Sequence, residues 1–541
     1  MGRKGRNCPA GLQIKDYIGG LLVTKATKLD VEEWNQLPWK IFADRVYKLQ
    51  CRIYEAAKSN DEQKVYGLQR LLLSSKAARY LAVRQVTQLN PSKKTDVIDG
   101  IRILNPKNRI VLAEELRTIK DWKHSKLRVE YITKPDETQV ILGIPRIKDI
   151  AAYCLVNYSL EPVYEAEASN GSYSFRPGRS AYDIQKKIFM QLRAISKTDK
   201  TQILRINIEN CLDKLDYEKI LNFIKIHKPF KPFLRSVLKV GILNKKNKIL
   251  EGTAKGKIFY PLLVNIAVNG VEDLLNENRG TDKEIQNGLR YANDILFFLK
   301  EEIDLIKLKI EINQFLDNRG LDASEAKIKL VKVTDGFDFL GWRFKVAKHR
   351  VLIYPSKDSF KNMVSKIKYT MKNSKYDITV RLEKIKVIYR DWFIYHRYCN
   401  LSEINLWSIK KWTCTYLKTN TKMSSIEADY NCIKIFSRQK YALNGYIAVS
   451  EQKSVYDGDL RYWSKRNDFR FDGLLAIKLK SQDYKCNYCQ LYFLPDDLVD
   501  LHYLDGNKKN FLSNNLEVLH RTCHHYKLLH FMKSKQGFTT Q

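Results

Sequence analysis

Residues 288 to 299 read Gly288-Leu-Arg-Tyr-Ala-Asn-Asp-Ile-Leu-Phe-Phe-Leu299, and they are the strongest indication of the fold class. Two short apolar runs flank its polar centre, Tyr291-Ala292-Asn293-Asp294. Apolar runs of this length, separated by a small polar turn, are typical of buried strands joined in a hairpin. The sequence therefore predicts a tight β-hairpin that carries Asn293 and Asp294 at its tip.

Outside this hairpin, the hydrophobic pattern predicts an α+β chain with several domains. A chain of 541 residues is too long for one core. Apolar residues at helical spacing predict helices over residues 31–90, from Pro145 to Leu160, over 261–275 and over 357–420. Other stretches predict strands over 127–145 and 203–208, and loops at 90–100, 169–180 and 241–257.

The chain carries a large excess of positive charge: 95 Lys and Arg residues against 60 Asp and Glu residues give +35. Such an excess, interleaved with 31 Tyr and 22 Phe, is typical of proteins that bind a long polyanion. The ten Cys residues suggest no disulfide framework, which favours a reducing compartment. No stretch reaches the ~18 apolar residues of a membrane span, so we expect no membrane partner.

A series of short stretches recurs in the order typical of one protein family. They are Leu68-Gln-x-Leu-Leu-x-Ser74, Ala82-Val-Arg-Gln-Val-Thr-Gln88, Leu142-Gly-Ile-Pro145, Leu160-Glu-Pro162, Ser172-Tyr-Ser-Phe-Arg-Pro-Gly-Arg-Ser180, Pro261-Leu-Leu-x-Asn265-Ile-Ala, Gly336-Phe-Asp-Phe-Leu-Gly341 and Arg390-x-Trp392-x-x-Tyr395-x-Arg397. With these motifs the chain resembles group II intron maturases, also called intron-encoded reverse transcriptases. The resemblance runs from about Trp34 to the end.

The resemblance implies an α+β multidomain architecture with right-hand polymerase-like fingers and palm. A helical thumb, called the maturase or X domain, and a small zinc-stabilised ββα HNH endonuclease domain would follow. We expect an N-terminal helical extension of the fingers at 1–100, fingers and palm at 101–345, the thumb at 346–450, and a linker with the HNH-like zinc domain at 451–541.

In this family the palm strand and the hairpin each supply an Asp that holds the catalytic magnesium ions. The resemblance places these positions on Asn207 and Asn293, while Asp294 remains. An amide is a neutral and weak ligand for Mg²⁺, and two-metal chemistry needs carboxylates to hold both ions. We do not expect Glu209 or Asp213 to replace the lost ligands.

Two further departures affect the same predicted site. The family's Arg-Pro before Leu-Gly-Ile-Pro is Val140-Ile141 here, and its Gly-Thr-Pro-Gln-Gly-Gly turn reads Gly252-Thr-Ala-Lys-Gly-Lys257. The sequence therefore predicts a degenerate polymerase site, with magnesium as a cofactor if the polymerase or the nuclease is active.

Basic residues in the fingers, palm and thumb are the candidates for RNA contact, because Lys and Arg bind phosphates without selecting a sequence. The set comprises Arg176, Arg179, Lys245, Lys246, Lys248, Lys366, Lys368, Lys372, Arg390 and Arg397. Among the aromatic residues, Trp392, Tyr395, Phe337 and Phe339 are better explained as core.

Near the C-terminus, Cys486-x-x-Cys489 is followed by His520-x-x-Cys523. Two such pairs suit a tetrahedral structural zinc ion. Interleaved with them, His502, Asn515 and His524 resemble the HNH motif, in which Asn515 would orient either the water-activating group or the loop and His524 would be a second catalytic-metal ligand. If His502 binds that metal, the general base position falls on Tyr503, which is a poor base at neutral pH; if His502 is the base, the metal position falls on Leu501.

Two functions from different classes follow from the resemblance. The first is an RNA-binding splicing cofactor that holds its host group II intron RNA in the catalytic form, without DNA synthesis. The alternative is an active reverse transcriptase with an HNH endonuclease that binds target DNA and drives intron mobility; a decayed reading frame ranks last. Frequent Lys, Ile, Asn and Tyr suggest an AT-rich genome, so we expect a chloroplast origin, with a mitochondrion or a bacterial cytoplasm as alternatives.

Overall fold

The computed structural model describes residues 17–18, 21–22, 33–89, 105–133, 139–195, 202–208, 216–239, 242–243, 249–250, 260–275, 288–299, 305–402, 404–436, 446–450, 453–466, 474–494 and 497–535. Predictions on Lys245, Lys246, Lys248, Glu209, Asp213 and the turn from Gly252 to Lys257 lie outside these residues. The backbone of Val140 and Ile141 belongs to a strand.

The predicted hairpin lies in a four-stranded sheet ordered β10-β5-β9-β8. These strands are β5 (Gln202–Asn207), β8 (Gly288–Tyr291), β9 (Asp294–Leu299) and β10 (Lys327–Lys332). Tyr291 pairs with Asp294, so the chain turns through Ala292 and Asn293 alone. Ala292 has a φ of 55°, the left-handed conformation that two-residue hairpin turns require. The prediction of a tight hairpin is confirmed.

Helices before the sheet form the N-terminal half of the main core. They are α2 (Trp39–Lys58), α3 (Glu62–Ser74), α4 (Lys76–Arg84), α5 (Pro106–Glu115) and α6 (Ile147–Glu167). Trp34, Phe42 and Leu72 are among their buried apolar residues, in line with the predicted helical spacing. Helix α6 continues past the predicted end at Leu160 and through Pro162, because most of this segment is buried and packing offsets the missing N–H.

The remaining elements of the first 330 residues connect this helical layer to the sheet. They are β3 (Leu127–Thr133), β4 (Gln139–Ile144), α7 (Ala181–Ile195), α8 (Tyr217–Phe223), α9 (Lys231–Leu238), β6 (Ile242–Leu243), β7 (Ile249–Leu250), α10 (Tyr260–Val268) and α11 (Leu305–Asn318). Strands β3 and β4 belong to a second sheet ordered β4-β3-β6-β7. The predicted helix over 261–275 ends early, because Gly270 adopts a φ of 93° and a 3-10 turn, Val271–Asp273, follows.

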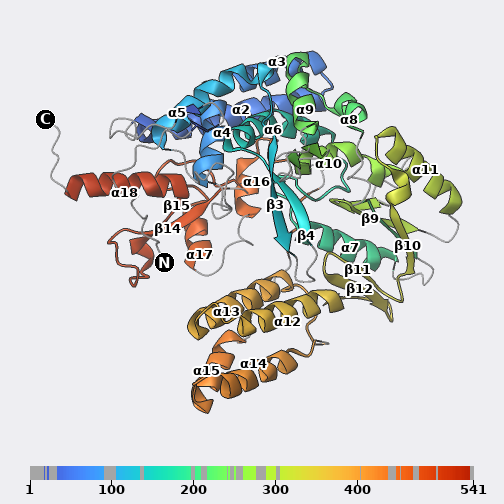
Figure 1. Cartoon of the computed structure of the whole chain (residues 1–541), viewed down its shortest axis with the longest axis vertical. Coiled ribbons are helices and arrows are strands. Elements are labelled where there is room, and N and C mark those ends of the chain that lie inside the picture. The colour runs from blue at the N-terminus through green and yellow to red at the C-terminus, as the bar shows by residue number, and fades with distance from the viewer. Residues whose placement is uncertain are drawn as a thin grey trace.

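A three-stranded sheet leads into a separate helical lobe. The elements are β11 (Phe337–Phe339), β12 (Trp342–Ala347), β13 (Arg350–Pro355), α12 (Lys357–Lys372), α13 (Ile378–Tyr395), α14 (Leu406–Asn420) and α15 (Ser425–Ile435). Figure 1 shows α12 to α15 together below the rest of the molecule. Their own core contains Met363, Ile385, Tyr389 and Trp392, so this part of the prediction over 357–420 is confirmed.

Residues 446–450 and 453–466, which include α16 (Leu460–Arg466), pack firmly on the body of the protein. Trp463 is fully buried in a cluster with Tyr54 of α2 and with Tyr456. The Arg466 guanidinium forms a buried ion pair with Asp183 of α7 at 3.0 Å. Much of the segment predicted as a linker is therefore part of the folded core.

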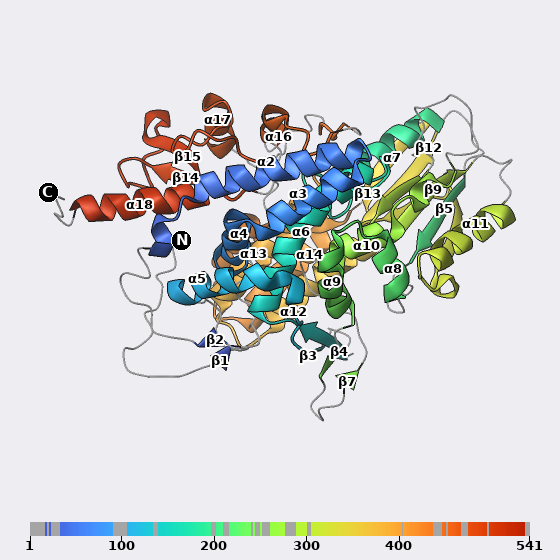
Figure 2. The same cartoon turned by 90° about the horizontal axis from the view of Figure 1, so that it is seen from above.

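The last elements are α17 (Leu474–Ser481), β14 (Val499–Tyr503), β15 (Leu516–His520) and α18 (Arg521–Lys535). They form a small unit beside the N-terminal helices, with α18 close to the start of α2 (Figure 2). The Tyr526 hydroxyl donates a hydrogen bond to the Leu37 carbonyl at 3.2 Å across this contact. Among the helices of the described residues, none is both long and apolar enough to cross a membrane.

Candidate functional site

The antiparallel pairing of β5 with β9 brings together the three predicted palm residues. Asn207 is the pairing partner of Asp294, and Asn293 lies at the adjacent turn. The Asn207 amide donates to the Asp294 carboxylate at 3.1 Å, and the Asn293 amide donates to the Asn207 side-chain oxygen at 3.4 Å. The amides therefore bond to their neighbours in the site.

Arg205 supplies the positive charge at this site. It lies two residues before Asn207 on β5, so both side chains are on the same face of the strand. Its guanidinium donates to both oxygens of Asp294, at 3.0 and 3.1 Å from Nη2 and 3.2 Å from Nε. Such a bidentate pair is among the stronger protein ion pairs.

This donor set does not fit a pair of magnesium ions. Asp294 is already bound by a guanidinium and an amide, and Asn207 and Asn293 carry no charge. Magnesium binds through carboxylates and phosphates and rarely accepts neutral amides as replacements for them. Our sequence interpretation missed Arg205, although the alternation of side chains along a strand would have placed it beside Asn207.

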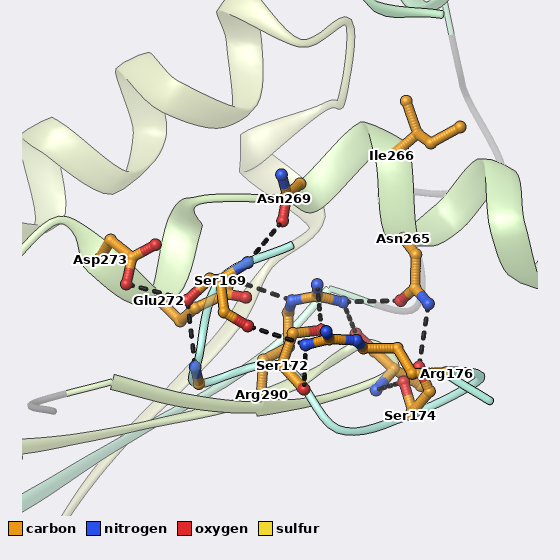
Figure 3. A network of polar contacts seen from close by, with 12 residues as sticks. Ser169, Ser172, Ser174, Arg176, Asn265, Ile266, Asn269, Glu272, Asp273 and Arg290 are labelled. Atoms are coloured by element: carbon orange, nitrogen blue, oxygen red, sulfur yellow. Dashed lines mark hydrogen bonds and ion pairs between the residues drawn. The ribbon is translucent and has the colours of Figure 1, made fainter. Parts of the chain in front are cut away.

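A second arginine, which belongs to strand β8 of the hairpin itself, fixes the hairpin to the neighbouring elements. Arg290 is fully buried, and its guanidinium bonds to Glu272 at 3.0 Å, to Asn265 at 2.9 Å and to Ser172 at 2.7 Å (Figure 3). Burial alone would lower the pKa of Arg290, but the charge of Glu272 outweighs it and raises that pKa. The motif residues Ser172 and Asn265 therefore position the hairpin.

Arg176 and Arg179 lie inside the protein, which corrects their assignment as RNA contacts. The Arg176 guanidinium pairs with Glu165 at 2.7 Å and donates to the carbonyls of Ser169 and Ser172 at 3.0 Å. Arg179 is 8% exposed, lies over the ring of Tyr173 and donates to the Lys453 carbonyl at 3.4 Å. Both side chains hold the Ser169–Ser180 loop in place, and because they are buried they are not available to bind RNA.

The predicted contacts in the helical lobe are mostly on the surface. Lys366, Lys368 and Lys372 project from α12 and are exposed, and Lys368 lies over the ring of Trp412. Arg390 is exposed and pairs with the adjacent Asp391 at 2.9 Å. Arg397 is half-buried between the rings of Tyr182 and Tyr398, which gives it a packing role.

A cavity of about 720 Å³ separates the central sheet from this lobe. Arg205 and Asp338 line it on one side, and Lys366, Trp392 and Tyr395 line it on the other. Its walls combine the cations Arg205 and Lys366 with three aspartates and with aromatic rings, so the cavity carries no excess of positive charge.

The four predicted zinc ligands lie together in the C-terminal unit. One ligand atom each from Cys486, Cys489, His520 and Cys523 lies within 4.8 Å of the others. Hydrogen bonds from Cys489 and Cys523 lower the pKa of the Cys486 thiol, which favours the thiolate that binds metal. Three thiols and one imidazole fit a structural zinc ion.

Asp497 completes this cluster and was missed by the sequence interpretation. Its carboxylate lies 3.3 Å from His520 Nε2, while His520 Nδ1 lies 3.3 Å from Cys489 Sγ. A carboxylate on the distal nitrogen fixes the ring and the tautomer of a metal-binding histidine. No spacing in the sequence connects Asp497 to His520, so the signal was in the fold alone.

The HNH-like residues are only partly brought together. The rings of His502 and His524 are 5.0 Å apart, and His524 Nδ1 lies 3.2 Å from the Asp500 carboxylate. Successive residues of β14 face opposite sides, so Tyr503 points away from His502 and packs near Phe511.

Asn515 binds a loop rather than the two histidines. Its amide donates to the Asp505 carboxylate at 2.9 Å and to the Asn510 carbonyl at 3.0 Å. These contacts agree with the alternative in which Asn515 orients the loop between the two strands.

Comparisons with known proteins agree with this geometry. Residues 34–116 match the family model of the N-terminal domain of reverse transcriptase, and residues 132–344 match that of reverse transcriptase (RNA-dependent DNA polymerase). Together the two matches span more than half of the chain.

Two relatives carry the name "Maturase-like protein 1". That of Euglena gracilis is 29% identical over 390 residues, which cover 71% of this chain and 82% of that protein. That of Euglena longa is 27% identical over 410 residues, covering 74% and 87%. A structure of Candida albicans telomerase with a fragment of telomeric RNA aligns at 12% identity over 60% of this chain and 64% of that chain, with a TM-score of 0.32. The chain therefore contains the N-terminal and RNA-dependent DNA polymerase domains of the reverse transcriptase family, and it is similar to two maturase-like proteins.

Proposed function

We propose that this protein binds folded group II intron RNA and promotes its splicing without copying RNA into DNA. The observation that carries the proposal is the state of Asp294, whose carboxylate is bound by Arg205 and Asn207. A polymerase site must hold two metal ions with anionic ligands, and this site offers an ion pair and two amides instead. The RNA would then perform the transesterifications itself.

The charge of the chain supports an RNA partner. A net charge of +35 favours a long polyanion, and the exposed Lys368 of α12 lies over the ring of Trp412, a pairing of cation and aromatic ring that suits contact with RNA. The name of the two Euglena relatives agrees with a maturase role. The alternative is a reverse transcriptase with an endonuclease that drives intron mobility. It needs carboxylate metal ligands at the two positions that Asn207 and Asn293 occupy.

The experiment uses the purified full chain in two assays. In a splicing assay at limiting magnesium, the protein should accelerate splicing of the group II intron that contains or adjoins its gene. In primer extension on an RNA template, the same preparation should incorporate no dNTP above background. Robust incorporation would overturn the proposal, and so would failure to accelerate splicing of any intron from the source genome.

For the C-terminal unit, we propose a structural zinc ion held by Cys486, Cys489, His520 and Cys523. The unit would support binding of nucleic acid but not cleavage, because Tyr503 faces away from His502 and its hydroxyl is a poor base. A plasmid-nicking assay with Mg²⁺ or Mn²⁺ tests this, and nicking that depends on His502 would contradict it. A chloroplast origin stays a prediction that the position of the gene would test.

A further inference from the structure

Two buried guanidinium groups lie where the N-terminal helices meet α18. Arg84 ends α4 and is 9% exposed, and Arg109 lies in the first turn of α5 and is 7% exposed. Their guanidinium carbons lie over the rings of Trp39 and Trp34, at 4.3 and 5.7 Å from the ring centroids. The rings therefore hold both groups in fixed positions.

Several other buried arginines among the described residues pair with a carboxylate, and these two do not. Arg290 pairs with Glu272, and Arg466 pairs with Asp183. Within the described part of the chain, the guanidinium groups of Arg84 and Arg109 form no ion pair and no hydrogen bond, and Arg109 Nε is a buried donor without an acceptor. The tryptophan rings offset only part of the hydration that a buried charge loses, so a guanidinium without an anion remains unfavourable.

The surroundings of this pair add to its positive potential. Burial lowers the pKa of both groups to about 10, and for Arg109 the charge of Arg84 adds to this effect. The first turn of a helix carries a partial positive charge of its own, so Arg109 stands where an anion is favoured. The buried amide of the adjacent Asn108 also has no hydrogen-bond partner among the described residues.

The site joins two parts of the protein. A side-chain hydrogen bond links Lys40 of α2 to the Cys489 carbonyl, and the Tyr526 hydroxyl bonds to the Leu37 carbonyl. Arg84 lies close enough to Tyr526 and Cys523 for their charges to affect its pKa. After Arg84 the helix loosens into a π-helix, Gln85–Leu89, a feature that is frequent at functional sites.

We propose that Arg84 and Arg109 form a phosphate-binding site for the backbone of the bound RNA, at the contact between the N-terminal helices and the C-terminal unit. Two guanidinium forks match the oxygens of a phosphate and stay charged at all physiological pH values. The identity of the RNA rests on the proposed function, whereas the affinity for a phosphate oxyanion does not. Free phosphate shares this chemistry, so the test must separate the two sources.

The first arm measures thermal unfolding of the full chain with inorganic phosphate or with chloride at the same ionic strength. The double variant Arg84→Met, Arg109→Met is compared with Arg70→Met, which removes an exposed arginine from the neighbouring α3. We expect phosphate to raise the melting temperature of the wild type and of Arg70→Met by several degrees. The double variant should melt higher than the wild type without ligand, because two unpaired charges are gone, and should not respond to phosphate.

The second arm measures RNA affinity against salt concentration with the same three proteins. Each lost phosphate contact should reduce the slope of log K against log [salt] by about 0.7 to 0.9, so the double variant should lose between one and two units. Its affinity for intron RNA should fall about tenfold or more, while Arg70→Met changes little. If the double variant does not fold, the single variants Arg84→Lys and Arg109→Lys are measured in its place. Each should keep part of the slope of log K against log [salt].

Each outcome decides between the explanations. If phosphate stabilises all three proteins equally, the two arginines are packing elements and the site does not exist. If phosphate protects the wild type but the salt slope for RNA is unchanged in the double variant, the site takes a free phosphate and the RNA assignment is overturned. If no protein binds intron RNA, the proposed function fails, and the first arm still reports on the site.

Discussion

The palm hairpin and the C-terminal cysteine cluster differ in whether their polar groups are already paired with other groups of the protein. At the hairpin, two amides replace anions, and the remaining Asp294 is matched by Arg205. In the cluster, three thiols and an imidazole converge on one point, and a carboxylate orients the imidazole. In the first site the charged and polar side chains are paired with one another. In the second site four possible ligand atoms lie close enough together to hold one ion. The difference indicates that this chain keeps a polymerase-like fold without the carboxylates of its metal site, while the cysteine cluster offers four possible ligand atoms close together.

Removing zinc should give the largest effect. Structural zinc contributes folding free energy on the order of 10 kcal/mol in small domains. We therefore expect chelation, or Cys486→Ala, to unfold residues 474–535 while the rest of the chain stays folded. Hydrogen exchange and limited proteolysis of the full chain measure this. Full protection of residues 474–535 in the metal-free protein would contradict the ligand assignment.

The second largest effect is expected when the buried ion pair between Arg290 of the hairpin and Glu272 is broken. Glu272→Gln leaves the Arg290 guanidinium buried without an anion, which costs about 3–5 kcal/mol. Denaturant unfolding of the variant reports the change in free energy. Glu218→Gln is the control, because its pair with Arg235 is exposed and its loss should leave the unfolding midpoint nearly unchanged. Equal effects of the two substitutions would contradict a supporting role for Arg290.

A smaller effect is expected when the orienting carboxylate of the cluster is neutralised. Asp497→Asn keeps the shape of the side chain but weakens its hold on His520, so zinc affinity should fall about 10- to 100-fold. Competition with a chromophoric chelator measures this on the full chain. Asp483→Asn, in an exposed pair with Arg461, should leave the affinity unchanged. Unchanged affinity in Asp497→Asn would show that another group orients the histidine.

The sequence predicted those parts of the molecule that depend on local pattern. Hydrophobic spacing predicted the hairpin and the α12–α14 helices, and the spacing of Cys and His residues predicted the four clustered ligands, because each signal lies between near neighbours in the chain. Long-range contacts escaped it: Asp497 reaches His520, and the residues around Trp463 fold back onto α2. Arg176 and Arg179 were assigned to RNA because charged residues in a loop are usually exposed. Their actual partners are the Glu165 carboxylate and the Lys453 carbonyl. Neither partner belongs to a motif, and Lys453 lies far along the chain from Arg179.

Restoring the two lost carboxylates should give the smallest effect. In the double variant Asn207→Asp, Asn293→Asp, Arg205 still pairs with Asp294 and remains on the same face of β5 as position 207. A guanidinium within hydrogen-bond distance competes with divalent cations for the same oxygens, so we expect no robust primer extension and weak Mn²⁺ binding. Adding Arg205→Ala should strengthen Mn²⁺ binding, because the protein cation is then absent. If the double variant alone copies RNA as an active family member would, the protein cation is not what keeps metals out, and the lost ligands account for the whole defect.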